Sequence, residues 1–265
     1  DLIPLNHPGF SDHRRASYQK TASRADAVVC LSEETKRSIC EQLSVDPVTC
    51  FVSPPAVADD LTVVSTPDLD SANWDDDIQR VRKEVGVKFT YIVYPAAFRT
   101  HKNHQRLFDA MRYVYTNLQL VLTTGESHFP AASQAIQAKL DTMNMSHRIL
   151  VAGALPRHDY LALLMGAEAL VCPSLDEGFG IPVAEAQAMR VAVISSRCGA
   201  LKEVATGSLE IDPLDHLDIA SKITALISDD DLKERITEEG WTNSRNYSKE
   251  WGPHGLVSAI RHVVV

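Results

Sequence analysis

Glu177-Gly-Phe-Gly-Ile-Pro-Val-Ala-Glu185 is the most informative stretch of the sequence, and it has the composition of a loop leading into a helix. Proline lacks an N–H group that would have no partner at a helix start, so Pro182 predicts a helix over 182–189. Glycines let a ligand approach the backbone, and a helix start offers free N–H groups and a positive dipole end. We expect Glu177 to project from the loop and Glu185 from the first helical turn, both toward one opening.

This pattern suits a sugar nucleotide as ligand. Backbone amides at a helix start hold phosphates, and the two carboxylates can accept hydrogen bonds from sugar and ribose hydroxyl groups. Two glutamates eight residues apart are a weak signal when they stand alone. The interpretation therefore depends on the organisation of the rest of the chain.

Short apolar runs alternate with segments of helical periodicity through the larger, carboxyl-terminal part of the chain. Such alternation is typical of an α/β fold in which a Rossmann-like parallel sheet has helices on both faces. Ligands of these sheets bind beyond the carboxyl ends of the strands, where the quoted stretch would lie. The expected strands are 91–95, 118–123, 149–152, 169–173, 191–195 and 209–211. The expected helices are 103–117, 129–143, 157–165, 182–189, 217–228 and 231–246.

The amino-terminal part has the pattern of a smaller α/β unit. Strands are expected over 27–31 and 48–52, and Ser32 is a suitable N-cap for a helix that runs to about Leu43. The polar stretch 59–71 has the composition of an interdomain linker.

Composition excludes several classes of protein. A net charge of -9 argues against nucleic acid as the main partner. Five cysteines without a C-x-x-C pair suggest reduced thiols in a cytoplasmic protein. No apolar run of this sequence has membrane-spanning length, and we expect neither a membrane-spanning helix nor a signal peptide. The sequence contains no Walker loop, nucleophile elbow or zinc-protease motif.

Five segments, in order along the chain, resemble the retaining glycosyltransferases of family GT4, which have two domains and the GT-B fold. Cys172-Pro-Ser-Leu-Asp-Glu-Gly-Phe-Gly-Ile-Pro-Val-Ala-Glu-Ala-Gln-Ala-Met189 resembles their donor-binding signature. The other four are Tyr94–His104, Val121–Gly125, Gly153–Pro156 with Leu161–Leu164, and Ser195–Val204. The resemblance covers about residues 1–250, and five ordered segments are far more specific than one.

The resemblance implies a domain organisation. Residues 1–64 would be a remnant of the amino-terminal, acceptor-side domain, since Asp1-Leu-Ile-Pro-Leu5 resembles the middle of that domain and most of it would be absent. Residues 65–250 would form the nucleotide-sugar donor-binding domain. Residues 251–265 would form a terminal helix that crosses back to the amino-terminal domain.

The resemblance also assigns roles to individual residues. Lys102 and Arg99 would place cations against the leaving diphosphate, and Glu177 would bind the donor sugar, so these three are the catalytic candidates. Arg99 stands three residues after the family's arginine position, occupied here by Ala96, and a solvated surface arginine is the open alternative. The candidates for donor binding are Glu185, Gly178, Phe179, Gly180, Ile181, Gly125 and Leu155.

Some of these positions have simpler alternatives. Phe179 can be a packing residue whose amide matters, Gly125 a turn glycine, and Leu155 a core leucine. His101 and His104 have a His-x-x-His spacing, but no further ligands are evident and we expect no metal site.

The implied activity is transfer of a sugar from a nucleotide sugar to an acceptor hydroxyl with retention at the anomeric carbon and without metal or other cofactor. GDP-mannose is the first expectation for the donor and a UDP-sugar the next, with a carbohydrate or lipid-linked acceptor. Two alternatives stay open: a donor-binding fragment that needs a partner chain for the missing domain, and a phosphorylase of GT-B architecture. The expected location is cytoplasmic, with a peripheral position at the inner face of the membrane left open.

Overall fold

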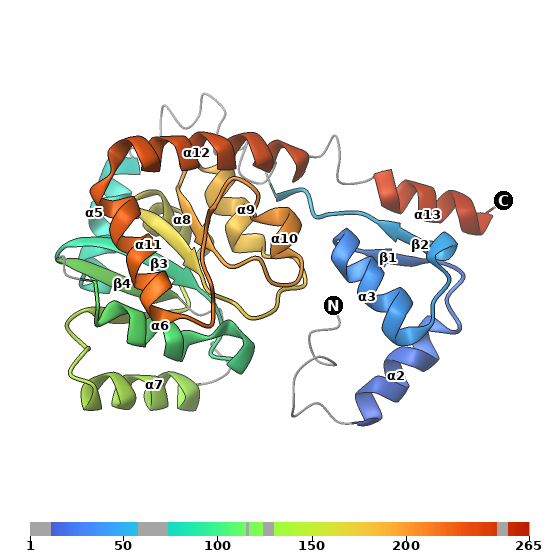
Figure 1. The fold of residues 1–265 in the computed structure, drawn as a ribbon, viewed down its shortest axis with the longest axis horizontal. Helices are drawn as coiled ribbons and strands as arrows, with labels where there is room; N and C mark the ends of the chain where they lie inside the picture. Colours follow the sequence, from blue (N-terminus) through green and yellow to red (C-terminus); the bar gives the residue numbers. More distant parts are fainter. Residues whose placement is uncertain (1–11, 58–73, 115–116, 124–129, 248–253, 265) are drawn as a thin grey trace.

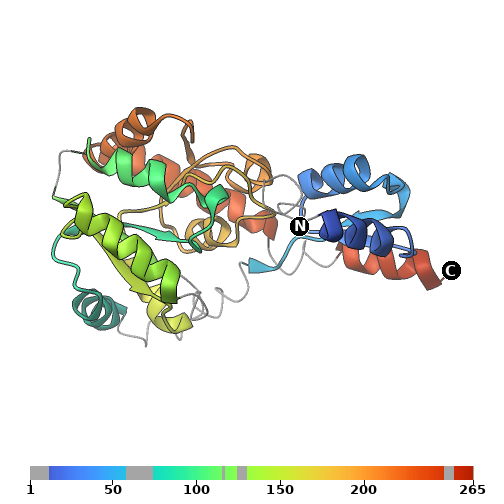
Figure 2. The same ribbon diagram turned by 90° about the horizontal axis from the view of Figure 1, so that it is seen from below.

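The computed structural model describes residues 12–57, 74–114, 117–123, 130–247 and 254–264, and shows a large and a small α/β part (Figure 1). The predicted α/β class with a parallel sheet between helices is confirmed. In Figures 1 and 2 the small part lies at one end of the molecule, beside loops of the large part.

A six-stranded parallel sheet forms the centre of the large part, in the order β5-β4-β3-β6-β7-β8. Its strands β3, β4 and β6 are almost wholly buried apolar runs, as expected where helices cover both faces. The bounds are β3 Thr90–Pro95, β4 Leu118–Thr123, β5 Ile149–Gly153, β6 Ala169–Cys172, β7 Val193–Ser195 and β8 Leu209–Glu210. All six agree with the predicted strands within two residues.

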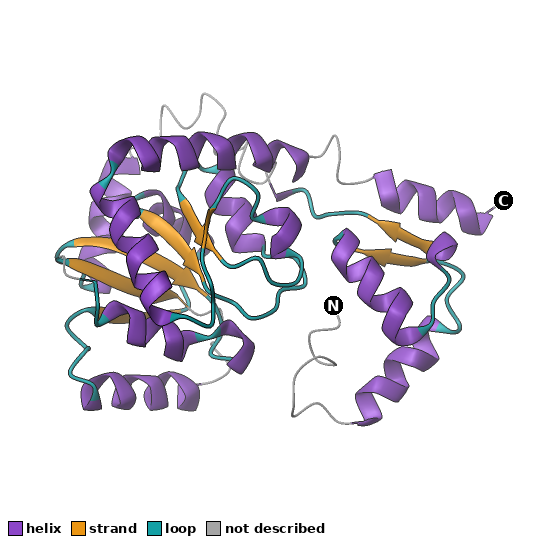
Figure 3. Ribbon diagram, viewed as in Figure 1, coloured by secondary structure: helices purple, strands orange, loops and turns teal. Residues whose placement is uncertain are grey.

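Helices pack on both faces of this sheet (Figures 1 and 3). Helices α6 and α11, which contact each other, lie on one face, and α5 and α8, also in contact, lie on the other. The bounds are α5 Trp74–Val85, α6 His104–Met111, α7 Pro130–Thr142, α8 Arg157–Met165, α9 Ile181–Ala188, α10 Leu201–Val204, α11 His216–Ser228 and α12 Asp230–Ser244, with 3-10 turns η2 Thr100–Lys102 and η3 Arg245–Tyr247.

The small part has two parallel strands, β1 (Val28–Cys30) and β2 (Cys50–Val52). Helices α3 (Glu33–Leu43) and α13 (His254–Val264) contact both strands, and α2 (Asp12–Ala22) contacts α3. The 3-10 turn η1 (Pro47–Thr49) precedes β2. Ser32 caps α3 as predicted, since its side chain accepts a hydrogen bond from the Thr35 amide. The domain boundaries at 64 and 250 stay predictions, and residues 59–71 lie outside the described residues.

One predicted helix needs correction, and three helices of the structure were not predicted. The helix predicted over 103–117 ends at Met111, because the Arg148 guanidinium donates to the carbonyl oxygens of Met111 and Val114 at 2.8 Å each. The helix over Trp74–Val85 was not predicted, although acidic residues in its first turn and basic residues in its last turn are a helix signal. Helices α2 and α10 were not predicted either.

The five cysteines are free thiols. Cys30, Cys40 and Cys50 meet in the small part, where Cys40 Sγ and Cys50 Sγ lie 3.7 Å apart. In the part of the chain that the structure describes, no helix combines the length and apolar character needed to cross a bilayer.

Candidate functional site

The candidate site lies where the order of the strands reverses. The chain runs from β3 outward through β4 to β5, then returns to β6 beside β3 and continues outward through β7 to β8. The loops that follow β3 and β6 therefore both begin at the carboxyl ends of these neighbouring strands. One then leads toward β4 and the other toward β7, so a crevice opens between them. This is the position at which open α/β sheets bind ligands.

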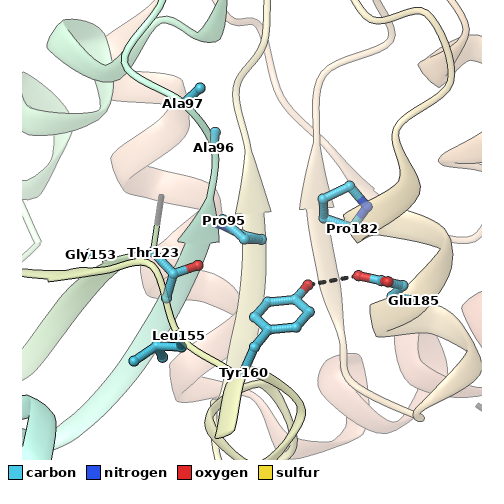
Figure 4. A pocket seen from close by; sticks show the side chains of 9 residues that line it. All are labelled: Pro95, Ala96, Ala97, Thr123, Gly153, Leu155, Tyr160, Pro182 and Glu185. Atoms are coloured by element: carbon cyan, nitrogen blue, oxygen red, sulfur yellow. Dashed lines mark hydrogen bonds between the residues drawn. The ribbon is translucent and has the colours of Figure 1, made fainter. Parts of the chain in front are cut away.

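A cleft of about 240 Å³ opens at this edge (Figure 4). The ends of β3, β4 and β5 line one side of it, and α8 and α9 contribute the other side. The lining residues are Pro95, Ala96, Ala97, Thr123, Gly153, Leu155, Tyr160, Pro182 and Glu185.

Glu185 is the carboxylate of this cleft, and its side chain is only 7% exposed. Arg157 Nη1 donates to Oε1 at 2.5 Å, and the Tyr160 hydroxyl donates to Oε2 at 2.8 Å, as Figure 4 shows for Tyr160. Burial, together with the neighbouring Glu185 charge, raises the pKa of Tyr160 well above its usual value. Tyr160 therefore stays protonated and acts as a hydrogen-bond donor to Glu185.

Lys102 and Glu177 form the second charged group of the site, and both side chains are mostly buried. Lys102 Nζ lies 2.6 Å from Glu177 Oε1, and the Ser174 hydroxyl donates to the same oxygen at 2.7 Å. The Tyr94 hydroxyl is 2.9 Å from Ser174 Oγ and donates to the Lys102 carbonyl oxygen at 2.8 Å. Two of the three predicted catalytic residues, Lys102 and Glu177, are thus direct partners although they lie 75 positions apart.

Backbone contacts hold the two loops of this pair together. The β3–α6 loop comprises residues 96–103 and the β6–α9 loop residues 173–180. Asn103, in the left-handed conformation at φ 58°, donates from its side chain to the carbonyl oxygen of Pro173 at 3.0 Å. The Leu175 amide donates to the His101 carbonyl oxygen at 2.7 Å. The position of Lys102 is therefore fixed relative to Glu177 by more than the ion pair.

The start of α9 differs slightly from the prediction. Gly180 is the N-cap, with φ 96°, and no side chain caps the helix there. A Cβ atom at Gly180 would lie 2.7 Å from Leu201 Cδ2, so both conformation and space favour glycine. Because the helix begins at Ile181, one residue earlier than predicted, Pro182 is its second residue and Glu185 its fifth, at the start of the second turn.

The two carboxylates do not share the cleft as the sequence analysis expected. Glu185 lines it, whereas Glu177 is not among its lining residues and is paired with Lys102 instead. The physical reason is the ion pair, which turns the Glu177 carboxylate toward the β3–α6 loop.

The other predicted residues take varied positions. Leu155 lines the cleft and also packs against the core, Phe179 is buried beside Tyr247, Gly178 is half-buried and Ile181 is exposed. Arg99 is exposed at the start of η2 and does not line the cleft. Gly125 lies outside the described residues.

His104 packs under the β3–α6 loop against the rings of Tyr94, Phe98 and Phe108. Burial lowers its pKa to about 4, so its ring is neutral near pH 7. Within the described ranges, no group of three or more His, Cys, Asp and Glu side chains is arranged to hold a metal ion.

Sequence reasoning missed several residues that shape the site. Ser174 and Tyr94 lie inside motifs that were recognised, and their polar side chains next to buried strands were an available signal. Arg157 and Tyr160 are one helical turn apart, but nothing local links them to Glu185. Gly199 was also missed: a Cβ atom there, at φ 59°, would lie 2.5 Å from the Glu177 carbonyl oxygen.

Comparison with known families identifies the large part. A family profile described as "Glycosyl transferases group 1" matches residues 75–242, which is more than half of the chain. The chain belongs to this family. The match includes the β3–α6 loop, the β6–α9 loop and the whole described cleft.

Curated relatives are longer proteins. The chain is 25% identical over 249 residues to a D-inositol 3-phosphate glycosyltransferase of Corynebacterium efficiens, covering 90% of this chain and 57% of that protein. It is 26% identical over 220 residues to the O-antigen chain mannosyltransferase RfbU of Salmonella typhimurium, covering 82% and 56%. The chain thus spans just over half the length of these relatives.

Solved structures share the fold. A glycosyltransferase from Rickettsia africae superposes with a TM-score of 0.78 at 17% identity, covering 96% of this chain and 68% of that one. Anabaena Alr3699/HepE, solved in complex with UDP and glucose, gives a TM-score of 0.75 at 15% identity, covering 99% and 68%. The architecture is that of GT-B glycosyltransferases.

Proposed function

We propose that this chain is the donor-binding part of a retaining glycosyltransferase of GT4 type. It moves a sugar from a nucleoside diphosphate sugar to an acceptor hydroxyl in the synthesis of a polysaccharide or glycoconjugate, without a metal. GDP-mannose is the first candidate donor and a UDP-sugar the second.

The observation that carries this proposal is the Lys102–Glu177 ion pair, which joins the β3–α6 loop to the β6–α9 loop. The cleft that contains Glu185 opens at the same edge of the sheet. An ammonium group has three N–H donors, and one of them contacts Glu177. Lys102 can therefore keep Glu177 in position and at the same time donate to a diphosphate oxygen.

This arrangement suits the following proposed chemical step. The bond between the anomeric carbon and the diphosphate oxygen breaks, the acceptor oxygen bonds to the same carbon, and the acceptor proton passes to the departing phosphate. Negative charge grows on the leaving diphosphate, and a fixed ammonium group in a mostly buried site stabilises that charge. Glu177 binds a hydroxyl of the donor sugar through its carboxylate and so orients the anomeric carbon.

Glu185 has the geometry for a ribose contact. Each carboxylate oxygen has two acceptor sites, and the described contacts of Glu185 use one on each oxygen. Ribose hydroxyl groups in the cleft can donate to the remaining sites while Tyr160 holds the carboxylate in place.

The choice of donor is supported by the names of relatives. Salmonella RfbU and an Escherichia coli protein, WbdA, are described as mannosyltransferases, which favours a mannosyl donor. The structure of Anabaena HepE contains UDP and glucose, which keeps a UDP-sugar as the second candidate.

Thermal unfolding with UDP, GDP and ADP at millimolar concentration tests donor binding. A ligand that binds the native state alone raises the melting temperature, by an amount equivalent to about 2.7 kcal/mol at one hundred times Kd. We expect a shift with GDP or UDP, and no shift with any of the three contradicts the proposal. Sugar transfer that persists in excess EDTA supports independence from metal.

A second candidate function is donor binding without turnover by this chain alone. Transfer or donor hydrolysis by the purified chain would eliminate it. Phosphate-dependent cleavage of a disaccharide would instead identify a phosphorylase.

A further inference from the structure

The first turn of α3, in the small part, contacts the β6–α9 loop that carries Glu177. Thr35 Oγ1 donates to the Gly178 carbonyl oxygen at 3.0 Å. Ser32 Oγ donates to Thr35 Oγ1 at 2.9 Å, which leaves the Thr35 proton for Gly178. Both hydroxyl-bearing side chains are buried, at 7% and 2% exposure for Thr35 and Ser32. The contact joins residues 143 positions apart and is partly buried.

A carboxylate reinforces this contact from the large part. The two oxygens of Glu203, in α10, accept hydrogen bonds from the backbone amides of Glu33 at 3.0 Å and Glu34 at 2.7 Å. These amides belong to the first turn of α3, where N–H groups lack helical partners and the helix dipole favours negative charge. Glu203 therefore caps α3 from outside and fixes Thr35 over the β6–α9 loop.

Helix α10 is itself attached to the Glu177 backbone. The Ala200 amide donates to the Glu177 carbonyl oxygen at 2.9 Å, and Gly199 lies so close that a Cβ atom would be 2.8 Å from the Glu177 nitrogen. Consecutive carbonyl groups of the loop, those of Glu177 and Gly178, are thus held by α10 and by α3. In a planar trans peptide the C=O and N–H groups point in opposite directions. Holding the Gly178 carbonyl toward α3 directs the Phe179 N–H away from it.

We infer that Thr35 is a positioning residue for the donor-binding loop: its hydroxyl fixes the Gly178–Phe179 peptide and so sets the loop geometry that the donor sugar meets. The effect of Thr35 on donor binding rests on the proposed function. The ordering of this loop by Thr35 does not depend on any ligand.

The primary test is hydrogen exchange of the amides over residues 178–181 in the full chain without ligand. Thr35→Val keeps the shape of the side chain and removes the donor, and we expect exchange to accelerate about fivefold, the factor for one lost neutral hydrogen bond. Thr35→Ser should restore the wild-type rate. Thr49→Val is the matched control, because Thr49 Oγ1 makes a similar bond, at 2.9 Å, to Asp46 within the small part. Equal exchange in Thr35→Val and wild type overturns the inference.

The consequence for the donor is tested by calorimetry with the pairs UDP and UDP-glucose, and GDP and GDP-mannose. We expect Thr35→Val to bind the nucleotide as wild type does but to lose about fivefold in affinity for the nucleotide sugar. An unchanged affinity for both ligands contradicts the role in sugar binding. If the wild type binds none of the four ligands, the proposed function fails, while the exchange experiment still decides whether Thr35 orders the loop.

Discussion

The large and small parts of this chain are both α/β units with parallel strands, yet they differ in the number of apolar side chains that they bury. The large part has one continuous core in which residues such as Phe108, Leu120 and Leu122 are fully buried. The buried residues of the small core are Cys30, Ile39 and Cys50, and apolar side chains on α13 such as Ile260 are more than half exposed. A two-stranded sheet with so little burial is marginal alone. The site geometry therefore depends mainly on the large part, and the small part acts through contacts such as Thr35 to Gly178.

The largest effect is expected from the core of the large part. Phe108→Ala should lower the free energy of unfolding by about 3–5 kcal/mol, because it removes a fully buried ring and leaves a cavity. Ile39→Ala, in the small core, should lower the free energy of the main unfolding transition by less than half as much. Urea denaturation followed by circular dichroism measures both, and equal losses would contradict the comparison.

Next in size is the effect of the charged pair. Lys102→Met should reduce turnover by about a hundredfold to a thousandfold, since one fixed donor to the developing charge is lost. Glu177 then keeps the Ser174 hydroxyl but no cation in the described structure, so stability should fall too. The double variant Lys102→Met/Glu177→Gln is the control: it should regain stability without regaining turnover. Recovery of turnover would show that the pair is structural.

The free energy of unfolding should also depend on pH, because His104 binds a proton in the unfolded chain more readily than in the folded one. Burial lowers its pKa in the folded chain to about 4, from a usual value near 6.5, so the unfolded chain binds a proton that the folded chain does not. The stability that His104 contributes is complete above pH 6.5 and is lost as pH falls toward 4, by about 3 kcal/mol in all.

The variant His104→Phe isolates this contribution. It should flatten the wild-type loss of stability between pH 6.5 and 4, and urea midpoints at several pH values measure the difference. The same slope in both proteins would mean that His104 does not cause the dependence.

The smallest effect is expected at the cleft. Tyr160→Phe removes one donor to Glu185 Oε2, and a neutral hydrogen bond contributes about 1 kcal/mol. We expect nucleotide affinity to fall about fivefold by calorimetry, with thermal stability nearly unchanged. Thr35→Val, acting from the small part, should instead affect only the nucleotide sugar, so the two variants separate the contributions of the two parts.

Much of the fold was predictable from the sequence because its signals are local. Buried runs such as Leu118–Thr123 define the strands, and Ser32 defines a helix start. The end of α6 was not predictable, because Arg148 terminates it from 37 residues away. Lys102, Glu177 and Glu185 stay predictions as site residues, and the sequence did not predict the partners that the structure gives them.

The pairing is decided by tertiary contacts. Glu177 faces Lys102 because the strand order brings β3 beside β6. Glu185, in α9, is bonded by Arg157 and Tyr160 of α8, a helix more than 20 residues earlier in the chain. Neither neighbourhood has a local sequence signal. For the same reason Thr35 and Gly199 were not recognised as parts of the site.

A crystal structure of the chain with GDP or UDP bound is the most direct test of the central claim. The account predicts diphosphate oxygens within about 3.5 Å of Lys102 Nζ and ribose hydroxyl groups donating to Glu185. A nucleotide bound away from the carboxyl edge of the sheet, with Lys102 still contacting Glu177 alone, would contradict it.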